Sequence, residues 1–86
     1  MENSEIIQIR YTSYDSFTKK YIFDIPHINN YIQILDANVE IFYFDHSMGL
    51  SDGNTIINFK EYPSAMVRVK KQGASNISIR GWNKNF

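Results

Sequence analysis

The most continuously apolar stretch of the chain, residues 39–44, lies near its middle and predicts a strand. In an alternating strand, three of its side chains would face one side and two aromatic rings the other. Because both faces are then apolar, we expect this strand to lie centrally in a sheet and to be covered on two sides.

Two alternating runs precede this stretch and predict an antiparallel hairpin. Residues 5–11 and 17–25 each alternate apolar and polar side chains, and a turn-forming segment at residues 12–16 separates them. Pro26 ends the second run, since proline cannot donate a hydrogen bond to a strand ladder.

Residues 27–35 favour a helix. Four apolar side chains recur at the i, i+3, i+4 and i+7 spacing of one helical face: Ile28, Tyr31, Ile32 and Leu35. A strand remains the alternative, because residues 32–34 also alternate. We favour the helix because a lone sheet with so many aromatic side chains would leave one of its faces uncovered.

After the central strand, two glycines mark residues 45–54 as the longest irregular segment, and we expect a ten-residue loop there. Alternation follows at residues 55–62, 65–71 and 76–82, and the segment 72–75 is expected to join the last two strands as a hairpin. The predicted fold class is α+β: a single domain over residues 1–86, with an antiparallel sheet of five or six strands and one helix in the order ββαββββ. An all-β small barrel is the alternative, and it follows if residues 27–36 are extended.

The alternation also predicts the core. The ten side chains expected inside are Ile7, Ile9, Phe23, Ile41, Phe42, Tyr43, Val67, Val69, Ile77 and Ile79. Composition supports a mostly β fold, because the chain has thirteen isoleucines but only two leucines and three alanines, and β-branched residues favour strands.

The absence of cysteine excludes a disulfide framework and a thiolate zinc site, and it fits a reducing cytoplasm. No stretch is apolar for long enough to span a membrane, and the acidic N-terminus does not fit a signal peptide. We therefore expect a cytoplasmic protein without a membrane partner. The excess of Ile, Asn, Lys, Tyr and Phe also fits AT-rich coding DNA, which is common in phages.

Charge is unevenly distributed, although the net charge is zero. Residues 1–62 carry all nine acidic groups and four basic ones, a net of −5, whereas residues 63–86 carry five basic groups and no acid, a net of +5. A C-terminal hairpin would then present a basic surface flanked by a tryptophan, suited to an acidic protein or a phosphate backbone. The candidate binding residues are Arg68, Lys70, Lys71, Arg80, Trp82 and Lys84. The alternative is a solvated face whose cations meet acids from the N-terminal half.

No motif indicates catalysis. His27 and His46 are the only imidazoles in the chain. In a strand, Asp45, His46 and Ser47 would point to alternate faces, so they cannot form a relay. The segment 45–52 also lacks the regular oxygen spacing of a calcium loop. We therefore expect no enzyme activity, no cofactor and no metal site; a tiny ribonuclease using the two histidines and Asp24 is the least favoured hypothesis.

Aromatic side chains are abundant, with thirteen in 86 residues. Most are expected in the core, but those at strand ends and turns are candidates for binding, because exposed Tyr, Trp and Arg dominate binding hot spots. The secondary candidates are Tyr11, Tyr14 and Tyr62.

Together these features favour a small protein-binding module. The most plausible form is an inhibitor encoded by a phage or mobile element that acts on a host defence protein by surface complementarity. Such a protein needs only one complementary surface, and the basic segment predicts a partner with an acidic surface. The alternative is a nucleic-acid-binding protein that uses the basic C-terminal hairpin.

Overall fold

The structure is a computed structural model that describes residues 5–26 and 30–83. Its regular elements over these residues are nine strands and one short 3-10 helix. They are β1 (Glu5–Ile9), β2 (Ser13–Asp15), β3 (Lys20–Asp24), β4 (Tyr31–Ile34), β5 (Ala37–Tyr43), β6 (His46–Asp52), β7 (Thr55–Asn58), η1 (Ser64–Met66), β8 (Val67–Lys71) and β9 (Ile77–Trp82).

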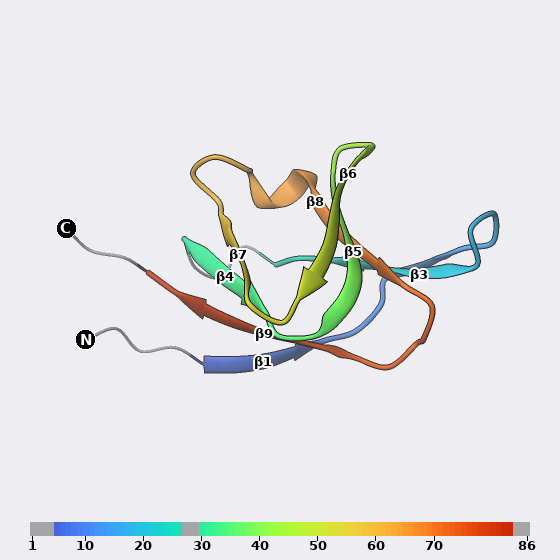
Figure 1. Cartoon of the computed structure of the whole chain (residues 1–86), viewed down its shortest axis with the longest axis horizontal. Coiled ribbons are helices and arrows are strands. Elements are labelled where there is room, and N and C mark those ends of the chain that lie inside the picture. Colours follow the sequence, from blue (N-terminus) through green and yellow to red (C-terminus); the bar gives the residue numbers. More distant parts are fainter. Residues whose placement is uncertain (1–4, 27–29, 84–86) are drawn as a thin grey trace.

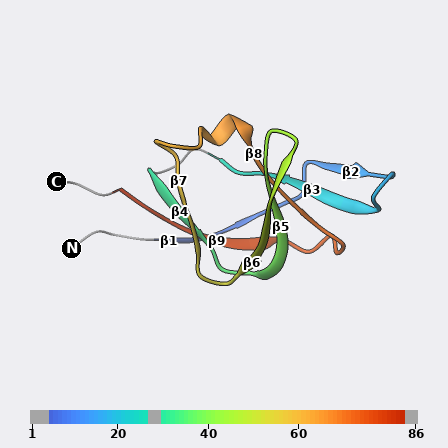
Figure 2. The same ribbon diagram turned by 45° about the horizontal axis from the view of Figure 1, so that its top comes forward.

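The nine strands form two antiparallel sheets. One sheet has four strands in the order β1-β9-β4-β7, and the other has five in the order β2-β3-β8-β5-β6 (Figure 1). Their buried side chains form one core cluster. The molecule is elongated, with extents of 43 × 23 × 21 Å, and the β2–β3 hairpin projects at one end of it (Figure 2).

The predicted helix is wrong. Residues 27–29 lie outside the described part of the chain, but the remainder of the segment is extended: Tyr31–Ile34 forms β4, between β9 and β7. Ile32 and Ile34 are both fully buried, so the period-two pattern decides over the helical spacing. The second sheet provides the cover that we expected from a helix. The fold is therefore all-β, which was the alternative, and not α+β.

The predicted ten-residue loop is also wrong. Most of that segment forms β6, which pairs with β5 across a tight turn at Phe44 and Asp45. β6 is the last strand of its sheet, and nearly all of its side chains are exposed. An exposed edge strand needs no apolar alternation, and for this reason the sequence pattern did not reveal it.

Both predicted hairpins are wrong in their pairing, although strands form within all four segments. β1 pairs with β9, and β3 pairs with β2 and β8. β8 pairs with β3 and β5, whereas β9 pairs with β1 and β4 in the other sheet. Alternation determines which side of a strand faces the core, but it does not determine the neighbouring strand.

The predicted core is largely confirmed. Six of the ten residues are buried: Phe23, Ile41, Val67, Val69, Ile77 and Ile79. Ile7, Ile9 and Tyr43 pack against this cluster and are partly buried. Phe42 lies on the opposite face of β5, half-buried beneath the Lys70 ammonium. β5 is thus second from the edge and covered on one side only, contrary to the prediction of a doubly covered strand.

Two irregularities bend the β5–β6 hairpin. At the first, where Asn38 has a φ of 64°, the buried Ser51 hydroxyl donates to the Asp36 carbonyl at 2.6 Å and accepts from the Val39 N–H at 3.2 Å. The second lies next to Gly49, which has a φ of 105°. Such bulges increase the local twist of a hairpin.

Candidate functional site

Two of the predicted basic residues are paired with carboxylates. Arg68 Nε lies 3.3 Å from Asp24 Oδ1, and Lys70 Nζ lies 3.5 Å from Asp15 Oδ2. The same ammonium lies 4.5 Å from the centre of the Phe42 ring. For these two cations the structure shows the alternative arrangement, in which they meet acids from the N-terminal half.

The other predicted basic residues lie elsewhere. Lys71 alternates to the opposite face of β8, where its ammonium donates to Ser75 Oγ at 2.8 Å. Arg80 and Trp82 belong to β9, in the four-stranded sheet. Lys84 lies outside the described residues. The structure therefore does not gather the six predicted residues on the face of one hairpin.

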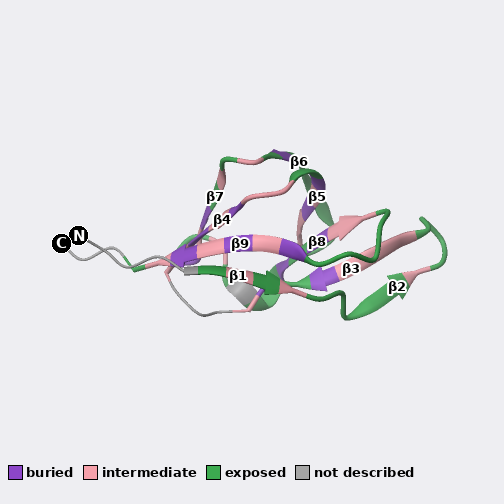
Figure 3. Cartoon of the chain, turned by 90° about the horizontal axis from the view of Figure 1, so that it is seen from below, coloured by how far each residue is buried: buried purple, intermediate pink, exposed green. Residues whose placement is uncertain are grey.

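Arg80 and Trp82 do share a face. The strand β9 alternates between buried and half-buried residues (Figure 3). Arg80 and Trp82 both belong to the half-buried set. The Trp82 ring stacks on Tyr31 of β4, with centroids 5.9 Å apart and an interplanar angle of 13°. Arg80 makes no ion pair in the described part of the chain.

The hairpin β2–β3, together with Arg10 and Tyr11 just before it, carries a cluster of tyrosines; we call residues 10–24 the tyrosine arm. The Tyr21 ring lies 4.7 Å, between centroids, from both Tyr11 and Tyr14. Tyr11 and Tyr14 remain about half exposed. The structure therefore brings together two of the three secondary candidates, on a hairpin that stands away from the body (Figure 2).

The turn of the tyrosine arm is ordered by Asp15. Its carboxylate accepts hydrogen bonds from the Phe17 N–H and the Thr18 hydroxyl, each at 2.9 Å. Its carbonyl accepts the Lys19 N–H at 2.7 Å, and Lys19 has a φ of 61°. The Thr18 hydroxyl, followed by the Phe17 N–H, lowers the pKa of Asp15 below its ordinary value. Phe17 is 95% exposed at this fixed turn.

The tyrosine arm lies in the basic half of the molecule. Residues 10–24 and the adjacent strand β8 carry six cations and two carboxylates, a net of +4. Both carboxylates, Asp15 and Asp24, take part in the ion pairs with β8. Arg10 and Lys19 are exposed, and neither forms an ion pair with a described residue. The arm therefore combines exposed rings with uncompensated positive charge.

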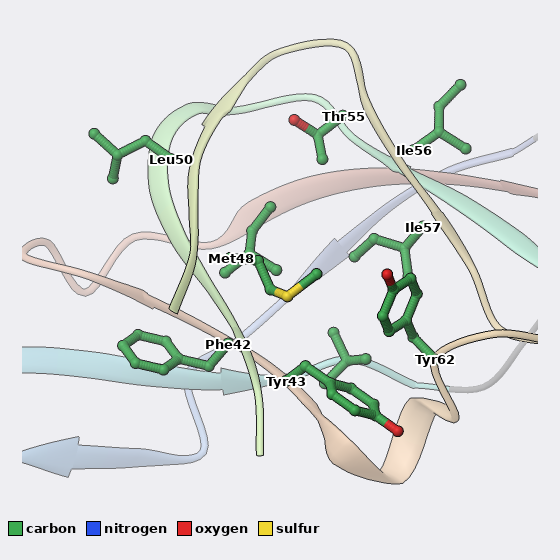
Figure 4. A pocket seen from close by; sticks show the side chains of 10 residues that line it. Phe42, Tyr43, Met48, Leu50, Thr55, Ile56, Ile57 and Tyr62 are labelled. Atoms are coloured by element: carbon green, nitrogen blue, oxygen red, sulfur yellow. The ribbon is translucent and has the colours of Figure 1, made fainter. Parts of the chain in front are cut away.

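A pocket of about 240 Å³ opens between the two sheets, beside the edge strands β6 and β7; we call it the seam pocket. Its lining residues are Ile41, Phe42, Tyr43, Met48, Leu50, Thr55, Ile56, Ile57, Tyr62 and Val67. Figure 4 shows Met48, Ile57 and Tyr62 pointing toward one another in the middle of the pocket.

The third secondary candidate, Tyr62, belongs to the seam pocket and not to the tyrosine arm. Its ring contacts Tyr43 edge-on, at 5.1 Å between centroids. Three apolar side chains at the pocket are more than half exposed: Met48, Leu50 and Ile56. The surrounding segment, residues 36–62, carries five carboxylates and one lysine, a net of −4. The seam pocket is therefore apolar inside and lies in an acidic half of the molecule.

The described residues contain no group of three or more side chains that could hold a metal ion. His46 and Ser47 begin β6, and the Ser47 hydroxyl donates to Glu40 at 3.2 Å instead of facing the imidazole of a histidine. Within the same residues, no helix is long and apolar enough to cross a membrane.

Sequence reasoning missed Phe17, Met48, Leu50 and Ile56 as surface groups. Phe17 follows a polar turn segment, and alternation predicts that it begins a strand, whereas the turn extends through residues 16–19. Met48 and Leu50 lie in the segment that the sequence predicts as a loop. Ile56 alternates with the buried Ile57, so the strand pattern alone indicated that one of the two faces outward.

Comparisons with protein-family models, with curated proteins and with solved structures find no match for this chain.

Proposed function

We propose that this protein is a non-catalytic protein-binding module that holds an acidic surface of its partner with the tyrosine arm. The observation that carries the proposal is the exposure of Tyr11, Tyr14 and Phe17 on a hairpin whose turn is already fixed by Asp15. Tyrosine and phenylalanine supply large contact areas, and a preformed turn lowers the conformational cost of binding.

The uncompensated charge of the arm favours an acidic partner over a neutral one. Arg10 and Lys19 add attraction that steers association and fixes the orientation of the two surfaces. In this proposal the protein acts in the cytoplasm, which the absence of cysteine supports. An inhibitor that a phage or mobile element directs against a host defence protein is the form we propose, since such an inhibitor needs one complementary surface and no catalytic residues.

The test is affinity capture by the tagged full chain from cells that naturally express it, with nuclease present. We expect a protein that the wild-type chain retains and that Tyr14→Ala and Phe17→Ala lose. The matched control is Ile6→Ala, which removes a side chain of 59% exposure from the other sheet. If no protein is enriched, or if the arm variants retain it as well as the control does, the proposal is wrong.

Nucleic-acid binding is the second candidate, and a different surface favours it. The stacked rings of Tyr31 and Trp82, with Arg80 on the same face, resemble a platform on which a base can stack. The paired state of Arg68 and Lys70 counts against the larger basic face that the sequence predicted. Fluorescence anisotropy with a labelled oligo-dT tests it: binding should fall steeply with added salt and disappear in Trp82→Ala but not in Tyr14→Ala.

A further inference from the structure

The side chain of Phe17 on the tyrosine arm and the seam pocket match in size. Phe17 is 95% exposed at the tip of the arm, so it contacts almost nothing in its own molecule. The seam pocket has a volume of about 240 Å³, and apolar cavities of roughly 150 Å³ already accept benzene. A phenylalanine ring is therefore small enough to enter the pocket.

The charges of the two regions are also complementary. The arm and the adjacent strand β8 carry a net of +4, and the residues 36–62 that provide most of the pocket carry a net of −4. Arg10 and Lys19 on the arm side, and Asp45 and Glu61 on the pocket side, form no ion pair among the described residues. Within one molecule the ion pair of Lys20 with Glu40, at 3.2 Å, joins the two regions. The four groups without an ion pair add attraction between the arm of one copy and the pocket region of another.

Apolar side chains are exposed to solvent at the opening of the seam pocket. Met48, Leu50 and Ile56 expose 52%, 65% and 56% of their surface around one opening. Exposed apolar side chains gathered around one pocket are typical of an interaction site. The opening lies between β6 and β7, which are the last strands of their sheets, so no further strand of the described chain closes it.

We propose that the seam pocket binds Phe17 from a second copy of this chain, with the basic arm of one copy against the acidic pocket region of the next. The inference rests on the proposed function, because it uses the same arm and names one of its partners. The two surfaces differ, so the contact is head-to-tail, and each copy keeps one free arm and one free pocket. Such a contact closes into a ring or continues as a filament.

Sedimentation velocity of the purified full chain tests the proposal. The wild-type protein should sediment faster as its concentration rises, and added salt should weaken this association because it screens the charges. Phe17→Ala removes the arm anchor, and Met48→Arg fills the pocket and reverses its charge preference; each variant should sediment as a monomer. Ile6→Arg, at a site of similar exposure on the other sheet, should associate like the wild type.

Mixing the two defective variants gives the sharper result. Phe17→Ala retains an intact pocket and Met48→Arg retains an intact arm, so an equimolar mixture should form a dimer and nothing larger. NMR spectra of each variant alone establish that it is folded, and in the mixture the amides of Gly49 and Phe17 should shift in the respective partners.

Three outcomes overturn the inference: a wild-type chain that stays monomeric up to about 1 mM, the range of weak contacts; a Phe17→Ala variant that associates like the wild type; or a variant mixture that stays monomeric or grows beyond a dimer. A monomeric wild type leaves the capture of another protein by the arm untouched. Loss of that capture, with self-association intact, refutes the proposed function alone.

Discussion

Replacing Ser51 by alanine tests how the bend in β5 is held. Ser51 is 3% exposed, and its hydroxyl connects two backbone groups: it donates to the Asp36 carbonyl at 2.6 Å and accepts from the Val39 N–H at 3.2 Å. Alanine removes both hydrogen bonds and changes the volume of the side chain only by one oxygen atom. The Val39 N–H is then buried without a partner, because Val39 is itself 2% exposed.

A buried donor that loses its partner costs about 1–3 kcal/mol of folding free energy. The whole chain has about 4–13 kcal/mol, at the usual stability per residue, so the loss is a large fraction. In urea, where a small domain has a slope of about 1 kcal/mol per molar, the unfolding midpoint should fall by about 1–3 M.

The matched control is Ser47→Ala on the same strand. Ser47 is exposed, and its hydrogen bonds to Glu40 and Gly49 lie at the surface, so its midpoint should move by less than about 0.5 M, given that surface changes stay within about 0.5 kcal/mol. A Ser51→Ala midpoint within the range of the control would refute the claim that this hydroxyl holds the bulge.

Three further predictions follow from the core, the arm and the β6–β7 turn. Ile41→Ala should lower the free energy of unfolding by about 2–5 kcal/mol in a urea titration, because Ile41 lies in the core cluster; a change below about 1 kcal/mol would contradict this. Hydrogen bonds from Thr18 and then Phe17 hold the pKa of Asp15 below 3.8. The turn therefore has its full stability above that pH and loses it as the pH falls through the lowered pKa. The chemical shift of the Phe17 amide should titrate with a midpoint below 3.8, and a higher midpoint would contradict the prediction. Gly53→Ala should lower the melting temperature, since Gly53 has a φ of 88° and a Cβ there comes within 3.3 Å of a backbone carbonyl oxygen; an unchanged melt would show that the turn relaxes without strain.

The sequence predicted well wherever a strand has one buried face. β3, β8 and β9 alternate as expected, and Phe23, Val69 and Ile79 are fully buried. In these strands the inward residues are large and apolar, and burial of such residues is the main driving force of folding, so the pattern and the structure have the same cause. Alternation failed for β6, where Ser51 is the one buried residue and the strand is held by pairing to β5.

The helix and the strand partners were out of reach for a different reason. The spacing of Tyr31, Ile32 and Leu35 fits a helix, and the alternation of Ile32 with Ile34 fits a strand, so local pattern leaves two solutions. The choice depends on β7 and β9, which supply neighbours on both sides of β4 from distant parts of the chain. Pairing with distant strands overrides the local spacing of apolar residues, so the local pattern alone does not decide between helix and strand.

The candidate site was also predicted in part: its charges can be read from composition, but their positions depend on strand topology. The charge split at residue 62 was visible in the sequence, but the predicted basic hairpin does not exist, because β8 and β9 belong to different sheets. Because β3 pairs with β8, Asp24 lies opposite Arg68 and forms an ion pair with it. Asp15, at the end of β2, lies close enough to Lys70 to form a second ion pair. The N-terminal acids of the arm are thus used to neutralise the C-terminal strand. Arg10 and Lys19 at the arm form no ion pair among the described residues, and residues 36–62 around the seam pocket carry a net of −4. The two surfaces proposed to bind therefore carry opposite charge, although both come from the N-terminal part of the chain that is acidic as a whole.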